Sequence, residues 1–229
     1  MNGQLFRTRR LATAHGTSFL GFLTILLPAC GLAASDRYSG EQQTPAIRVL
    51  VINSSLVDDK TLSSALRKAE VIFHDAGVRV TWIRCPGDTQ AVDPSGCRSD
   101  DVRTLFLRIV RQLPTGYRGR DAMGVALVAG QDSRYATVFH ERVSAMVPRT
   151  KPGLEGVILG HVIAHELGHL LLGTNAHAPF GLMAAGLSSV QLERAACGLV
   201  EFWPAEAAAI RAEVLRRSNE SRLASVANP

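Results

Sequence analysis

The chain has 229 residues, of which 46% are hydrophobic, with 25 lysine and arginine residues against 20 aspartate and glutamate residues. Three of the 25 basic residues, Arg7, Arg9 and Arg10, lie in the first 34 positions, which hold no acidic residue, so 22 basic residues face 20 acidic ones over residues 35–229. This near balance, without a basic run interleaved with aromatic residues, excludes a nucleic-acid-binding role.

Residues 1–34 have the pattern of a secretory signal peptide. The basic start is followed by an apolar run from Phe19 to about Ala34, which is short for a membrane span and is interrupted by Pro28. We therefore expect cleavage at the end of this segment and a secreted or periplasmic protein. An alternative is lipidation of Cys30, because the letters LPAC loosely resemble a bacterial lipobox, and only this modification would attach the chain to a membrane.

Residues 35–229 are enough for one domain with a hydrophobic core. The stretch 46–53 (AIRVLVIN) predicts a buried strand, and a helix capped by Asp58 or Asp59 is expected to run to about Ala76, before Gly77. The alternating stretch 78–83 (VRVTWI) predicts a second strand. This strand–helix–strand order favours a parallel pair with a right-handed crossover.

Further strands are predicted in the middle of the chain, at 105–109, 123–129 and 134–139. We expect one of them to form a sheet edge that borders a cleft, because an exposed edge can bind an extended peptide. Three nearby side chains are candidates for lining that cleft, although ordinary surface positions explain them equally well: Tyr135, His140 and Glu141.

The cysteines beyond Cys30 predict one disulfide. Cys85 and Cys97 bracket a loop rich in turn residues, and in an exported protein this pattern indicates a bond that closes the loop. Cys197 is left over at the end of a predicted helix, where we expect a buried thiol.

The strongest signal is HELGH at residues 165–169, inside a predicted helix over 154–172. Because residues four apart lie on one helix face, His165 and His169 can offer two imidazoles to one metal ion. Glu166 lies about 100° around the helix, from where it can reach a water on that metal. Two histidine ligands and a glutamate general base are typical of a zinc peptidase.

A third ligand is expected after Gly173, which can end the helix. The chain can then turn back and bring His177 to the metal. Glu193, in the following predicted helix, is the alternative, because a glutamate completes the site of thermolysin-like enzymes. His161 is excluded as a ligand, since it lies eight residues before His169, about 12 Å along a helix, and remains a candidate for the cleft wall.

These residues resemble the metzincin clan, particularly its matrixin-like members, which carry H-E-x-x-H-x-x-G-x-x-H and then a Met-turn. The chain is also similar to uncharacterised exported bacterial proteins with the same HELGHLLLG, NAH and Met pattern. The resemblance implies that Met183 supports the site from below. Gly173 and His177 lie four and eight residues after His169, so the loop is two residues longer than the clan's pattern.

Two helices are predicted after Met183, at 188–196 and 204–217, followed by a frayed tail over 218–229. We thus expect an α+β fold: a single zincin-like domain over 35–229 with a mixed, mostly parallel twisted sheet and an active-site helix carrying HELGH. The predicted function is that of a monomeric, Zn²⁺-dependent endopeptidase that acts on peptide or protein substrates. The sequence does not indicate which side chain would stabilise the oxyanion. The alternative is an exported zinc-containing binding module that does not cleave.

Overall fold

The structure is a computed structural model that describes residues 44–86, 97–112, 122–130, 133–186 and 189–227. The described strands form one five-stranded sheet in the order β2-β1-β3-β5-β4. Their bounds are Ala46–Asn53 for β1, Arg79–Cys85 for β2, Thr104–Val110 for β3, Gly124–Leu127 for β4 and Tyr135–Phe139 for β5. The pairs β1–β2, β1–β3 and β3–β5 are parallel, and β4 pairs with β5 antiparallel. The mixed, mostly parallel sheet is confirmed.

The predicted strand–helix–strand unit at the start of the sheet is confirmed. Helix α1 covers Asp59–Asp75, and the Asp58 carboxylate caps it by accepting hydrogen bonds from the backbone N–H groups of Lys60 (3.1 Å) and Thr61 (3.0 Å). Gly77 ends the helix with a φ of 78°, a conformation that favours glycine. The chain then enters β2 beside β1, with Val49 opposite Trp82.

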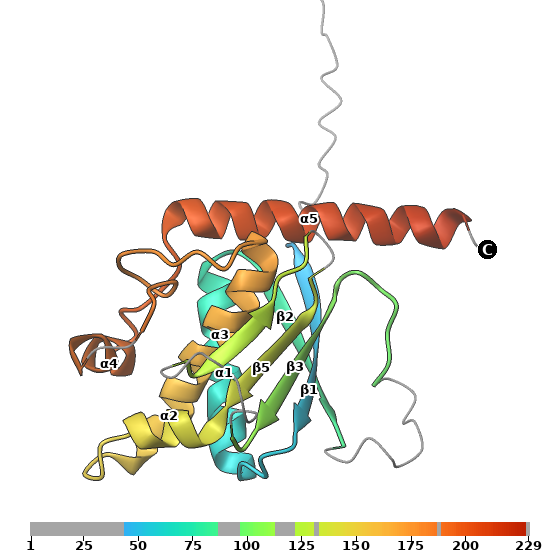
Figure 1. Cartoon of the computed structure of the whole chain (residues 1–229). Coiled ribbons are helices and arrows are strands. Elements are labelled where there is room, and N and C mark those ends of the chain that lie inside the picture. Colours follow the sequence, from blue (N-terminus) through green and yellow to red (C-terminus); the bar gives the residue numbers. More distant parts are fainter. Residues whose placement is uncertain (1–43, 87–96, 113–121, 131–132, 187–188, 228–229) are drawn as a thin grey trace, which may run out of the picture. The chain divides into compact units, whose positions relative to one another are not determined.

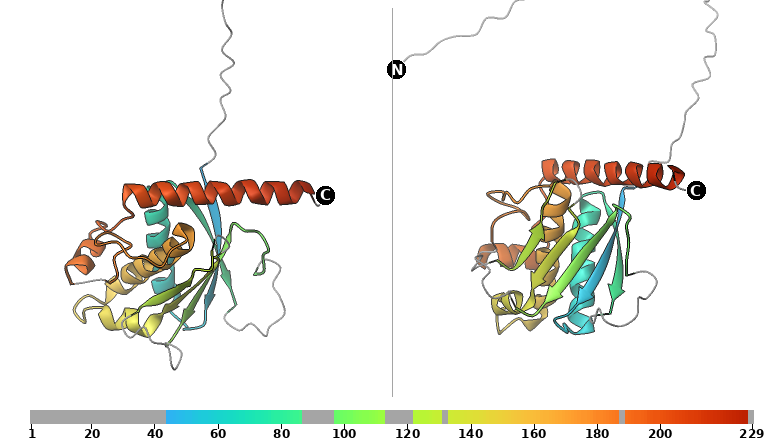
Figure 2. Two further views of the ribbon diagram at one scale, coloured as in Figure 1. Left: turned by 45° about the horizontal axis from the view of Figure 1, so that its top comes forward. Right: turned by 45° about the vertical axis from the view of Figure 1, so that its right-hand side comes forward.

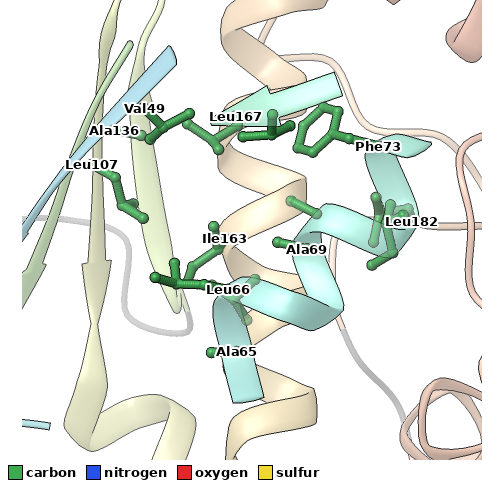
Figure 3. Packing of buried hydrophobic residues seen from close by; sticks show 14 of the residues in the cluster. Val49, Ala65, Leu66, Ala69, Phe73, Leu107, Ala136, Ile163, Leu167 and Leu182 are labelled. Carbon is green, nitrogen blue, oxygen red and sulfur yellow. The ribbon is translucent and has the colours of Figure 1, made fainter. Parts of the chain in front are cut away.

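Two helices cover one face of the sheet, namely α1 and α3, which spans Glu155–Leu172 (Figures 1 and 2). The inward side chains of β1 and β3 meet them in the core, as Figure 3 shows for Val49 and Leu107 against Leu66, Ile163 and Leu167. The two helices approach closely at Gly160, where a Cβ atom would lie 2.6 Å from the carbonyl oxygen of Ala65. A larger residue there would push α3, and the site it carries, away from α1.

The C-terminal helices are α4 (Ser189–Ala196) and α5 (Pro204–Ala227), and α5 contacts both α3 and β1 (Figure 1). Arg217 of α5 is 1% exposed and donates hydrogen bonds to Glu213 and to the carbonyl oxygens of Val102, Ser133 and Leu170. The predicted end of this helix at residue 217, with a frayed tail from 218, is wrong. The helix continues to Ala227, because no glycine or proline interrupts residues 218–227 and half of them are good helix formers.

Helix α2 (His140–Met146) and a short 3₁₀ helix (Pro152–Leu154) were not predicted. They connect β5 to α3. Helix α2 ends at Met146, and Pro148 begins the turn that follows, in which the Lys151 N–H donates to the Pro148 carbonyl oxygen at 2.8 Å. Among the residues that the structure describes, no helix has both the length and the apolar character needed to cross a membrane.

The disulfide between Cys85 and Cys97 is confirmed, with a Cα–Cα distance of 5.7 Å. Residues 87–96 of the loop that it closes lie outside the described residues. The buried thiol predicted at Cys197 is wrong, because this side chain is exposed. Ala195, in α4, is buried. Because each residue of a helix turns by about 100°, Cys197, two residues further, falls on the opposite, exposed side.

Candidate metal centre

Helix α3 positions the first part of the site. Nearly all of it is buried, and it ends at Gly173, whose φ of 65° and ψ of 25° are left-handed. The Gly173 N–H donates to the carbonyl oxygen of His169, which closes the last turn. The left-handed residue reverses the chain, as the sequence predicted, and directs the following segment back towards the helix.

The returning segment, residues 174–184, forms a closed turn. The Ala178 N–H donates to the Met183 carbonyl oxygen at 2.8 Å, and Ala178 also forms a parallel bridge with Ala184. This turn brings His177 to the helix. The nitrogen atoms that His165, His169 and His177 can offer to a metal all lie within 4.8 Å of one another. The two extra residues in the loop therefore do not prevent the third histidine from reaching the other two.

Backbone carbonyl groups fix the orientation of two of these rings. His165 Nδ1 lies 2.8 Å from the Leu182 carbonyl oxygen, and His169 Nδ1 lies 2.8 Å from the Thr174 carbonyl oxygen. A carbonyl oxygen only accepts, so each Nδ1 carries the proton and each Nε2 presents a lone pair. Metal-binding histidines in proteins are held in this way by a second hydrogen bond.

The two lone pairs face each other, because the Nε2 atoms of His165 and His169 are 3.0 Å apart. Neither atom can donate to the other in these tautomers, and only a cation makes such a contact favourable. Burial lowers the pKa of His165 to about 4, and it also lowers the pKa of His169. Both rings are therefore neutral near pH 7, which is the state that binds a metal. The three residues fit a divalent cation.

Glu166 is 6% exposed and lies beside the edge strand β4. Burial raises its pKa to about 8. Gly124 of β4 makes room for it, since a Cβ atom there would lie 2.6 Å from Glu166 Cγ. Gly124 could not be identified from the sequence, because the contact depends on how the strand and the helix pack.

A pocket of about 460 Å³ opens beside the histidines and connects α3, β4 and the loop after α3. It is lined by Ala122, Met123, Gly124, Val125, Ala126, His161, Val162, His165, Glu166, His169, Asn175, His177, Leu182, Ala184, Ala185 and Gly186. The cleft border predicted from one of the middle strands is thus formed by β4. This pocket can hold a substrate in contact with all three histidines and Glu166.

Met183 is 1% exposed and packs against α3 at Gly168. A Cβ atom at Gly168 would lie 2.8 Å from Met183 Sδ and 2.8 Å from the Phe202 ring. Glycine at the fourth position of HELGH therefore lets the methionine turn approach α3. The resemblance to the metzincins implies a supporting position for the methionine but offers no reason for this glycine.

The other candidate residues lie elsewhere. Glu193 is exposed on α4 and does not belong to the cluster of potential ligands among the described residues. The three residues proposed as cleft lining do not line the pocket. Tyr135 stacks on Phe106 with 4.8 Å between ring centres, Glu141 pairs with Arg111 at 2.6 Å, and His140 pairs with Glu155 at 2.9 Å. His161 does line the pocket.

No protein-family model matches the chain, and no curated protein matches it. Among solved structures, the chain is similar to archaemetzincin from Methanopyrus kandleri, with a TM-score of 0.50 and 18% sequence identity. The match covers 75% of this chain and 97% of the archaemetzincin chain. At this identity the likeness concerns the fold, and it confirms the predicted α+β architecture with a mixed sheet and a helix that carries HELGH.

Proposed function

We propose that this chain is an exported zinc-dependent endopeptidase. The observation that carries the proposal is the cluster of three histidine side chains on the wall of a pocket, with potential ligand atoms within 4.8 Å of one another and a buried carboxylate beside them. Three protein ligands leave one position of a tetrahedral site open, as in catalytic rather than structural zinc sites.

Zinc is the ion that best suits three imidazoles, and we assign His165, His169 and His177 as its ligands. When bound there, zinc would acidify a water and polarise a substrate carbonyl. Neither Glu166 nor the exposed Glu193 is needed to complete this ligand set.

Glu166 is assigned as the general base. A carboxylate oxygen of Glu166 takes the proton from the attacking water and passes it to the leaving amine. Burial favours the protonated carboxyl, and a neighbouring dication favours the carboxylate. These two effects act on the pKa of Glu166 in opposite directions.

Peptide binding is assigned to strand β4. It lies at the end of the sheet order, pairs on one side with β5, and contributes Gly124, Val125 and Ala126 to the pocket. Backbone groups on the other side of the strand can pair with an extended substrate, whose scissile bond then lies over the histidines. This arrangement favours cleavage within a polypeptide.

Membership of the metzincin clan, close to the matrixins, is part of the proposal. The fold neighbour carries the clan's name, and the chain combines HELGH, a third histidine and a methionine turn.

Export is supported by the basic and apolar N-terminal segment and by the Cys85–Cys97 disulfide, which is typical of an oxidising compartment. Lipidation of Cys30 stays an alternative route of anchoring.

The test is cleavage of a mixed peptide library by the zinc-loaded chain, with Glu166→Ala as the matched variant and mass spectrometry of the products. We expect cleavage by the wild type, none by the variant, and one zinc per chain in both. If neither protein cleaved any peptide while each bound one zinc, this result would contradict the proposal and favour a zinc-containing binding module.

A further inference from the structure

The closed turn after α3, residues 174–184, has a hollow on each of its two sides. His177, Leu182 and Ala184 line the pocket that contains the histidine cluster. Residues 179–181 of the same turn line a second groove of about 760 Å³, together with residues of α4 and of the connection from α4 to α5. A single segment of chain therefore forms the wall between the pocket and the groove.

The lining of the groove is apolar and exposed. It contains four large apolar residues that are each between 45% and 67% exposed, namely Phe180, Val190, Leu199 and Trp203. Single exposed apolar residues are ordinary, whereas a group of them in one hollow marks a place where another molecule binds. The two charged lining residues, Arg194 and Glu201, have opposite signs, so the groove favours neither an anion nor a cation.

The walls of the groove are held in place by the protein itself. The Leu182 N–H donates to the Glu201 carbonyl oxygen at 2.9 Å, which ties the turn to the connection before α5. Gly181 has a φ of 81°, and a Cβ atom there would lie 2.6 Å from Trp203 Cδ1, so glycine lets the turn approach the indole ring. The Trp203 N–H donates to the Glu206 carboxylate at 2.8 Å. A preformed apolar groove binds a ligand without the cost of ordering its walls.

We propose that the groove is a second substrate-binding site, which receives an apolar side chain of the same polypeptide whose scissile bond lies at the histidine cluster. The inference rests on the proposed peptidase function and adds a determinant of its specificity. The shared wall favours the substrate as the occupant, because one bound polypeptide can then fill both hollows. An extended chain advances about 3.3 Å per residue, so a few residues can cross the turn. Leucine, methionine and phenylalanine suit the groove, because each buries a large apolar surface.

The test is a binding measurement on the zinc-loaded Glu166→Ala chain. A mixed library of peptides of about twelve residues, which span about 40 Å when extended, is passed over the immobilised chain, and retained peptides are identified by mass spectrometry. Each apolar residue of a retained peptide is then replaced in turn by serine. We expect one replacement to weaken binding by about tenfold, as expected for the loss of one buried apolar side chain.

Trp203 reports on the groove directly, because the chain has only one other tryptophan, Trp82 in β2. Binding of the retained peptide should change the tryptophan emission, and Trp203→Phe should abolish this change while keeping most of the affinity. Phe180→Ser should weaken binding of the retained peptide by about tenfold and make its serine version bind equally well. Leu223→Ser is the matched control, since Leu223 is an exposed apolar residue of α5 outside the groove.

The outcomes separate this inference from the proposed function. Binding that depends on one apolar residue of the peptide and is weakened by Phe180→Ser supports the inference even when the wild type cleaves no peptide. Cleavage of a retained peptide by the wild type, with equal affinity of Phe180→Ser and Leu223→Ser for it, overturns the inference and leaves the peptidase proposal intact. Self-association of the wild type in sedimentation equilibrium that Phe180→Ser abolishes would assign the groove to a second copy of the chain and also overturn it. Retention of no peptide overturns it too.

Discussion

The two ends of α3 carry two polar clusters of similar composition and opposite character. At its start, Glu155 accepts a hydrogen bond from His140 Nε2 at 2.9 Å, and His140 Nδ1 lies 3.0 Å from the hydroxyl group of Ser55. Ser144 also donates to Glu155. Both ring nitrogens of His140 therefore have protein partners. At the other end, His165 and His169 use only Nδ1 for the protein.

The difference shows what separates a structural cluster from a binding site. In the His140 cluster, every ring nitrogen is paired within the protein, which joins the loop after β1 to the first residues of α2 and α3. In the His165 cluster, lone pairs face one another at 3.0 Å and lie on a pocket wall. Unused bonding capacity, more than the presence of histidine and glutamate, identifies the place where an external ligand binds.

Exchanging the glutamate in each cluster should separate the two clusters most strongly. Glu166→Gln should lower kcat by a factor on the order of 10³, because it removes the base while keeping the shape of the side chain. Zinc content, measured by atomic absorption, should stay unchanged. Glu155→Gln should leave kcat near the wild-type value, since this residue lies outside the pocket. Similar losses of activity in both variants would contradict the distinction between a structural cluster and a binding site.

The histidines can be compared in the same way. His177→Ala removes one of three ligands and should weaken zinc binding by at least about a hundredfold, a loss larger than that of an outer-shell partner. Competition with a chromogenic chelator measures this change. His140→Ala should leave zinc affinity unchanged and should lower the free energy of unfolding by about 1 kcal/mol, from its two lost hydrogen bonds. If His177→Ala retained full zinc affinity, the assignment of this residue as a ligand would be wrong.

Much of the site could be predicted from the sequence because its main part is local. HELGH places two histidines on one helix face by helical geometry alone, and Gly173 indicates the end of the helix from its backbone freedom. The approach of His177 is less local, since it depends on the turn that joins Ala178 to Met183. The sequence left the third ligand open between His177 and Glu193 for that reason.

The remaining features depend on packing between distant segments. Helix α2 has only seven residues and follows Phe139, a residue type that does not cap helices, so neither length nor capping indicated it. The fit of Gly124 to Glu166 and of Gly168 to Met183 requires the paired sheet and the folded turn. The helical continuation of α5 beyond Arg217 was missed because its exposed residues show no apolar periodicity.

A substitution at Gly124 can displace Glu166 without changing it. Gly124→Ala adds a methyl group 2.6 Å from Glu166 Cγ and should displace the carboxyl group. A shift of about 1 Å in a catalytic group can cost about a hundredfold in rate, so we expect kcat to fall by a factor between about 10 and 100. Zinc affinity should hold, and Gly153→Ala, which meets no neighbouring atom within 4 Å, is the matched control. Equal activity in the two variants would contradict the close fit of Gly124 to Glu166.

The smallest effect concerns the stability of the metal-free chain. Burial raises the pKa of Glu166 from 4.5 to about 8, so between these values the folded chain holds a proton that the unfolded chain has lost. The stability linked to this group is present below pH 4.5 and is lost as the pH rises through about 8. His165 acts oppositely, because its pKa falls from 6.5 to about 4 and its contribution is lost as the pH drops through that window.

Comparing wild type with Glu166→Gln isolates the carboxyl group, since the histidine contributions are common to both chains. Without metal, the free energy of unfolding of the variant should increase relative to that of the wild type by on the order of 3 kcal/mol between about pH 5 and about pH 8. Urea unfolding in the presence of a chelator measures this difference. With zinc bound the gain should shrink, because a nearby dication favours the carboxylate and lowers the pKa of Glu166. Parallel curves for the two metal-free chains would mean that Glu166 is well solvated, contrary to its burial beside Gly124.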